Sequence, residues 1–229
     1  MHMKLLQVPR HSFLLLLISL LLMLVVSPYL KEYPFLNFDN ILLNPFLSTI
    51  FVTSLYLVTD NRRFFIIGLL ILIPVLVINT RFYFDKTSIN PLISSFVYIF
   101  FFSYISLFLC RFLIKSKTVS INVLYAAVCL YLFIAIIWSF IYVATYHSLD
   151  GAFSFSENLI KHADIDHNST SLFSYFSFVT MTTLGYGDIT PIHPIARAWV
   201  AVQSILGQLY LAIVMARLVG LYIVDAKKK

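Results

Sequence analysis

The chain has 229 residues, of which 60% are hydrophobic and 11% are charged, and its mean hydropathy is +0.91. Soluble domains carry about 25% charged residues, so this composition excludes a soluble protein and indicates an integral membrane protein. The net charge of +6 gives no sign of a nucleic-acid partner. The sequence contains no nucleotide-binding loop, catalytic dyad or metal-binding cluster, so we expect neither an enzyme nor a resident cofactor.

The first half of the chain predicts four membrane helices. They are expected at Ser12–Leu30, Ile41–Thr59, Phe64–Asn79 and Pro91–Ile114. We expect the first to be a retained helix rather than a signal peptide, because Ser27-Pro28-Tyr29 near its end is not a small-residue cleavage site. Pro74 should kink the third helix, which is followed by a polar loop at Arg81–Asn90.

The second half predicts two further spans, Ser120–Tyr146 and Ile195–Val224. After the first of them comes an outer polar loop, His147–Thr170, with a glycosylation sequon at Asn168. The apolar segment that follows, Ser171–Thr182, is shorter than the roughly 20 residues that a span needs. It therefore predicts a re-entrant helix that enters the membrane without crossing it.

The basic residues orient these segments. When both ends of the chain are placed in the cytoplasm, most of the 16 Lys and Arg residues lie on the cytoplasmic side, as the positive-inside rule requires. The sequence thus predicts an all-α, multi-pass protein of the cell membrane, with six transmembrane helices, a re-entrant helix and both termini cytoplasmic. We expect a four-helix membrane domain at 1–118 and a second domain at 119–229 that contains the re-entrant helix.

The segment after the re-entrant helix reads Thr180-Met181-Thr182-Thr183-Leu184-Gly185-Tyr186-Gly187-Asp188. Gly185 and Gly187 lack a Cβ, so they can adopt left-handed backbone conformations. Alternating such residues with ordinary ones turns successive carbonyl groups to the same side. A ring of such segments can replace the water shell of a dehydrated cation, and the Thr183 hydroxyl adds an oxygen at the inner end of the row.

This segment resembles the selectivity filter of tetrameric potassium channels, Thr-Val-Gly-Tyr-Gly followed by Asp, except that Leu184 stands where Val is usual. The resemblance extends over about Ser120–Val224 and implies an outer helix, a pore helix, the filter and an inner helix. One filter per chain implies a homotetramer in the lipid bilayer, with K+ as the permeant ion. The implied filter ends at Gly187, and the implied K+ sites are at Thr183, Leu184, Gly185 and Tyr186.

The same resemblance assigns roles to residues around the filter. Asp188, Tyr175 and Thr182 are expected to support it, and the Tyr175 hydroxyl is placed to meet Asp188. Tyr186 should point away from the pore axis and brace the filter against the pore helix. Gly207 matches the usual inner-helix hinge, although close packing against the pore helix is another reason for glycine there. A stripe at helical spacing is expected to line the cavity, or else to face the fifth span: Gln208, Leu211, Ala212 and Met215.

The resemblance implies a potassium-selective channel that conducts passively. Three alternatives stay open: a non-selective cation channel, because Leu184 changes the packing behind the filter; a potassium transporter, which would need four such hairpins; and a membrane sensor with a structural pore-like half. Steep voltage gating needs about 3–4 charges per subunit, whereas Pro91–Ile114 carries one basic residue, Arg111, near its cytoplasmic end. We therefore expect no steep voltage gating. The stimulus is expected to act in the membrane or through an unknown regulatory subunit, unless the sequence is part of a longer chain.

Overall fold

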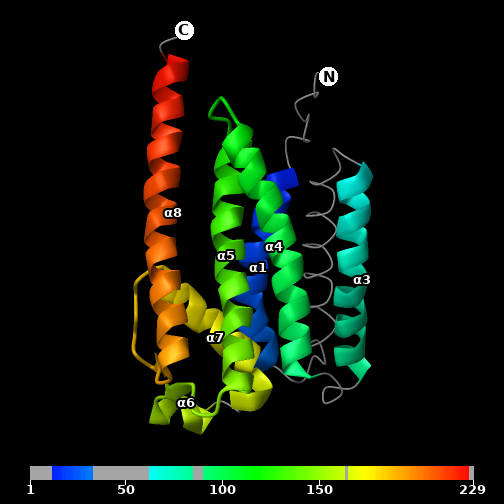
Figure 1. The fold of residues 1–229 in the computed structure, drawn as a ribbon, viewed down its shortest axis with the longest axis vertical. Helices are drawn as coiled ribbons and strands as arrows, with labels where there is room; N and C mark the ends of the chain where they lie inside the picture. The colour runs from blue at the N-terminus through cyan, green and yellow to red at the C-terminus, as the bar shows by residue number, and fades with distance from the viewer. Residues whose placement is uncertain (1–11, 33–61, 85–89, 163–164, 227–229) are drawn as a thin grey trace. The chain divides into compact units, whose positions relative to one another are not determined.

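The structure, a computed structural model, describes residues 12–32, 62–84, 90–162 and 165–226 (Figure 1). Over these residues the chain is mostly helical, with one pair of short strands that the sequence analysis did not predict. The elements in chain order are α1 (Ser12–Glu32), α3 (Arg62–Phe84), α4 (Pro91–Lys115), α5 (Ile121–Ser148), β1 (Phe153–Phe155), α6 (Glu157–His162), α7 (Ile165–Met181), β2 (Ile189–Pro191) and α8 (Pro194–Ala226). The predicted second span, Ile41–Thr59, lies outside the described residues.

Residue contacts divide the chain into two compact units. One comprises Met1–Ile89 with Tyr104–Leu132, and the other comprises Asn90–Ser103 with Phe133–Lys229. The division passes within α4 and α5, so each of these two helices contributes to both units. The domain boundary predicted at residue 118 stays a prediction.

In the first unit, one face of α1 is buried. Phe13, Leu16 and Leu20 recur at helical spacing, and all three are almost fully buried. The Phe13 ring lies 4.9 Å from the ring of Phe112 on α4. The Cys129 thiol of α5 approaches the Phe13 carbonyl oxygen at 3.8 Å, so α1 packs against both of these later helices.

The helix α3 continues beyond the predicted end at Asn79. It runs to Phe84, and the loop predicted to begin at Arg81 is wrong to that extent. The physical reason is in the sequence, because Arg81 is followed by three aromatic residues that continue the apolar run. Pro74 lies inside the helix, where its missing N–H removes one helical hydrogen bond.

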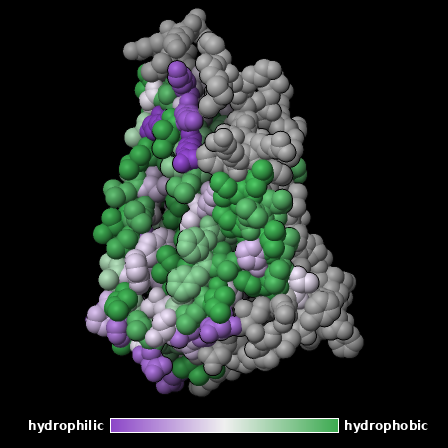
Figure 2. All heavy atoms as spheres, turned by 45° about the vertical axis from the view of Figure 1, so that its right-hand side comes forward, coloured by the Kyte–Doolittle hydropathy of each residue, from purple (hydrophilic) through white to green (hydrophobic). Residues whose placement is uncertain are grey.

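Three helices of the described residues are long and apolar enough to cross a membrane. They are Pro91–Lys115, Ile121–Ser148 and Pro194–Ile223. The helices α1 and α3 contain shorter apolar stretches, Phe13–Val25 and Ile66–Thr80. Hydrophobic side chains, green in Figure 2, cover much of the visible surface, as lipid contact requires. The six-span layout stays a prediction.

The second unit is built on aromatic packing between α5, β1 and α7. The Tyr142 ring lies edge-on to Phe176 at 5.1 Å, and Phe153 lies edge-on to Phe173 at 4.8 Å. Trp138 extends this packing to α8 through Trp199, at 5.8 Å. Edge-to-face pairs of this kind contribute about 0.5–1.5 kcal/mol each beyond the burial of their surface. They hold α7 between α5 and α8.

Candidate functional site

The helix that leads into the candidate site is longer than predicted. It begins at Ile165, whereas the sequence predicted a polar loop through Thr170 with the Asn168 sequon in it. That part of the prediction was wrong: the sequon lies in a helix, and β1 and α6 occupy the earlier part of the same segment. Hydropathy alone cannot distinguish a polar helix start from a loop. In the structure, Ser169 in this polar helix start is buried.

The helix α7 ends in a Schellman motif, and this motif forms the inner end of the predicted filter. The Leu184 N–H donates to the Val179 carbonyl at 2.9 Å, and the Thr183 N–H donates to the Thr180 carbonyl at 3.0 Å. These bonds satisfy carbonyls that a helix end leaves without partners. The motif requires a left-handed residue at Thr183, whose φ is 59°. Glycine is usual at that position, so a threonine there does not indicate the left-handed conformation.

Left-handed residues then recur at every second position. After Thr183, positive φ values occur at Gly185 (55°) and Gly187 (78°). The intervening Leu184 and Tyr186 are not among the positive-φ residues. An alternating backbone of this kind turns successive carbonyl groups toward one side of the strand, which is the arrangement that a dehydrated cation requires. The left-handed conformation costs an L-residue such as Thr183 about 1–2 kcal/mol.

The outer end of this segment is held by Asp188. Its side-chain oxygens accept hydrogen bonds from the Tyr175 hydroxyl (2.8 Å) and from the Ile189 N–H (3.1 Å). Its backbone carbonyl accepts a third from the Ser156 N–H at 2.9 Å. The hydrogen bond from Tyr175 was expected from the sequence; its support of a filter stays a prediction.

Tyr175 also contacts the segment through its ring. Its ring stacks on Tyr186 with a centroid separation of 6.4 Å and an interplanar angle of 4°. Loss of water around the phenol is the main cause that raises the pKa of Tyr175 to about 12, and the hydrogen bond and negative charge of Asp188 add to it. The hydroxyl therefore keeps its proton, and remains a donor to Asp188, at physiological pH.

Strands β1 and β2 secure the chain after Asp188. They pair antiparallel, with Phe153 opposite Pro191 and Phe155 opposite Ile189. Beyond the strands, the Ile192 N–H donates to the Ala152 carbonyl at 2.9 Å. The chain leaving the candidate filter is thus fixed to the segment that follows α5.

A buried polar cluster joins α7 to α5 and α8. We call it the helix junction, and it consists of Tyr142, Ser177 and Gln203. The Tyr142 hydroxyl donates to Gln203 Oε1, and Gln203 Nε2 donates to the Ser177 carbonyl (3.0 Å) and hydroxyl (2.7 Å). The Ser177 hydroxyl donates in turn to the Ala135 carbonyl at 2.6 Å. The sequence analysis missed this cluster, because only a contact between distant helices distinguishes these residues from other polar residues in spans.

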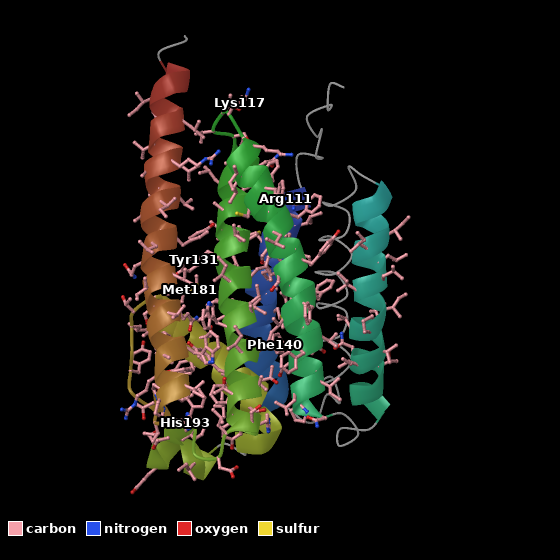
Figure 3. All side chains as sticks on the ribbon, in the orientation of Figure 1. Arg111, Lys117, Tyr131, Phe140, Met181 and His193 are labelled. Atoms are coloured by element: carbon pink, nitrogen blue, oxygen red, sulfur yellow. The ribbon has the colours of Figure 1, made fainter. Side chains whose placement is uncertain are left out.

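Gly207, one turn beyond Gln203, lies against the end of α7. A Cβ built on Gly207 would be 2.6 Å from the Met181 carbonyl oxygen, and Met181 lies beside the middle of α8 in Figure 3. Of the two reasons that the sequence allowed for this glycine, close packing is therefore present. The hinge stays a prediction.

The other predicted residues lie at the surface of the single chain. The filter residues from Thr183 to Gly187 are exposed, and so are all four residues of the predicted cavity stripe. Whether the stripe lines a cavity or faces α5 stays a prediction. The Thr182 hydroxyl donates to the Phe178 carbonyl of its own helix at 2.7 Å, so it strengthens the end of α7.

The helix α5, α7 with its left-handed exit, and most of α8 lie in one continuous segment of the chain. Residues 118–223 match a family model described as an ion channel. This match covers slightly less than half of the chain and supports ion transport as its function. Comparison with curated proteins and with solved structures found no match.

Proposed function

We propose that the protein is a potassium-selective channel that conducts K+ passively across a cell membrane. The observation that carries this proposal is the alternation of left-handed residues at Thr183, Gly185 and Gly187 in a segment held at both ends. A backbone fixed in this way presents the carbonyls of Thr183 to Tyr186 as ligands that replace the hydration shell of K+. The Thr183 hydroxyl supplies the innermost oxygen.

Four copies of the chain are needed to complete this site. A single strand cannot enclose an ion, whereas four strands around one axis form successive rings of oxygens. The exposure of the filter residues and of most of α8 in the single chain supports this assembly. In the tetramer, Gln208, Leu211, Ala212 and Met215 face the central cavity. The C-terminal ends of the four α7 helices point toward that cavity, where their partial negative charge attracts a cation.

The membrane layout is part of the same proposal. The chain crosses the bilayer six times with both termini in the cytoplasm, and the filter lies near the outer face. Arg111 lies near the proposed cytoplasmic end of α4, and Lys117 lies in the loop that follows this helix (Figure 3). His193 directly precedes α8, at its proposed outer start. This distribution agrees with the positive-inside rule.

One residue supports a second candidate, a non-selective cation channel. Leu184 replaces the β-branched Val of the usual filter, and its side chain is 55% exposed in the single chain. A leucine has more rotameric freedom than a valine. The Leu184 side chain therefore constrains the surrounding filter backbone less than a valine would.

Recording from the purified protein in planar bilayers, under opposed K+ and Na+ gradients, decides between the two. A K+-selective channel reverses close to the K+ equilibrium potential. A reversal midway between the K+ and Na+ potentials would establish the non-selective channel instead, and absence of any current from assembled tetramers would refute both.

A further inference from the structure

The helix junction has no unsatisfied hydrogen-bonding group on Gln203. Its carbonyl oxygen accepts from Tyr142, and its amide group donates to two oxygens of Ser177. All three side chains are 0% exposed, so water does not compete for these bonds. A buried amide with all its bonds made fixes the relative position of its neighbours, because hydrogen bonds are directional and apolar contacts are not.

The contact between α7 and α8 has two points, one turn apart on each helix. Gln203 meets Ser177, and four residues further along both helices Gly207 meets Met181. Residues four apart lie on the same face of a helix. Two such points on one face prevent α7 from sliding along α8 or rotating against it.

The last turn of α7 transmits this position to the candidate filter. The Val179 carbonyl accepts hydrogen bonds from the N–H groups of Leu184 (2.9 Å) and Gly185 (3.4 Å). Val179 lies between the two contact points, Ser177 and Met181. The hydrogen bonds of the helix and its Schellman motif therefore connect Gln203 to the first filter residues.

From this connection we propose that Gln203 is a positioning residue for ion selectivity. Its amide sets the position of α7 against α8, and through Val179 it sets the distance of the Thr183 and Leu184 carbonyls from the pore axis. The proposal rests on the potassium channel function proposed above. A small displacement of these carbonyls changes how well they replace the water shell of K+ rather than that of Na+.

Two variants test the proposal. Gln203→Met keeps the volume and the burial but leaves the Tyr142 hydroxyl without its acceptor, so it also lowers stability; the Ser177 hydroxyl still donates to the Ala135 carbonyl. The triple variant Tyr142→Phe, Ser177→Ala, Gln203→Met removes all the side-chain polar groups together, which is far less destabilising than removing one of them. The triple variant therefore separates hydrogen-bonded positioning from simple packing.

Ser139→Ala and Ser204→Ala are matched controls. Each removes a serine hydroxyl from the same helices, but these hydroxyls donate to Ile136 and Val200, within their own helices. Tetramer content and thermal stability are measured in detergent. The K+/Na+ permeability ratio is then measured from reversal potentials in bilayers.

We expect both Gln203 variants to lower the permeability ratio by about threefold or more, a change that corresponds to the coupling energies of contacting residues. We expect the triple variant to unfold near the wild-type temperature and the controls to retain the wild-type ratio. A folded triple variant with wild-type selectivity would overturn the positioning role of Gln203 but leave the proposed channel function standing. A wild-type protein without K+ selectivity would overturn the proposed function and this inference with it.

Discussion

Gly207 of α8 touches the carbonyl oxygen of Met181, the last residue of α7, so closely that a Cβ at this position would lie 2.6 Å from that oxygen. The neighbouring atom is part of the backbone, which cannot rotate away as a side chain can. Glycine is therefore required here for packing, whether or not α8 also bends at this point.

The first prediction concerns Gly207→Ala. Overpacking against the α7 backbone should destabilise the protein by about 1–3 kcal/mol. The matched control is Gly220→Ala on the same helix, where an added Cβ meets no atom within 4 Å. There alanine should be neutral or stabilise the helix by about 0.5–1 kcal/mol. Thermal unfolding of the two purified variants checks this, and equal stabilities would show that the contact is not tight.

The second prediction concerns Gly185→Ala. Its added Cβ would meet no atom within 4 Å, but its φ of 55° is unfavourable for any residue with a side chain, by about 1–2 kcal/mol. Gly151, with a φ of 66° and equally open space, is the matched control outside the filter. Both alanine variants should lose similar stability, yet only Gly185→Ala should lose selective K+ current. Selective current from Gly185→Ala would mean that the segment is not the filter.

The third prediction concerns the hydrogen bond between Tyr175 and Asp188. Tyr175→Phe removes this bond, which contributes about 1 kcal/mol, and keeps the ring that stacks on Tyr186. We expect a lower K+/Na+ permeability ratio, because the candidate filter loses a hydrogen bond at its outer end. Asp188→Asn keeps an oxygen for the hydroxyl, so it should preserve more selectivity than Asp188→Ala. The same loss in both Asp188 variants would assign the effect to charge instead of the hydrogen bond.

The fourth prediction concerns external pH. The ordinary pKa of tyrosine is 10.0, and that of Tyr175 is raised to about 12. Because the protonated phenol is the donor, its contribution is complete below pH 10 and is lost as the pH rises through 12. The difference in selectivity between wild type and Tyr175→Phe should thus be nearly the same at about pH 7 and about pH 11, where a tyrosine with the ordinary pKa would have lost most of its proton. A difference that disappears by about pH 11 would contradict the raised pKa.

The fifth prediction concerns voltage. The middle of α4, from Phe100 to Tyr104, has no charged residue, and the rings of Phe101 and Phe102 are buried. Steep gating requires about 3–4 charges per subunit to move through the field. The basic residues of α4, Arg111 and Lys115, both lie near its C-terminal end. The conductance–voltage curve in symmetric K+ should be shallow. A slope that requires more than about two gating charges per subunit would contradict this.

Hydropathy and the filter motif predicted the long apolar helices of the second half well. The predicted spans Ser120–Tyr146 and Ile195–Val224 correspond closely to α5 and α8, because long apolar runs are a strong and local signal. The motif likewise located the left-handed residues Gly185 and Gly187, since glycine itself permits that conformation.

Features that depend on distant contacts could not be predicted in this way. Strands β1 and β2 have three residues each, too few for an alternating pattern, and they exist only because they pair with each other. Gln203 lies within an apolar span, and nothing near it in the sequence indicates its contact with Tyr142. The left-handed conformation of Thr183 depends on where α7 ends. Hydropathy predicts the end of a helix only approximately.

The pairing of β1 with β2 also determines the order in which this half of the chain can fold during synthesis. Phe153 is made before α7, whereas its partner Pro191 is made after the whole re-entrant segment. Pairing between residues so far apart must await closure of the intervening loop. The newly made α7 therefore has no strand pairing beyond its exit until Pro191 has been made. The pairing of Pro191 with Phe153 is the step that fixes the chain after the candidate filter to the segment that follows α5.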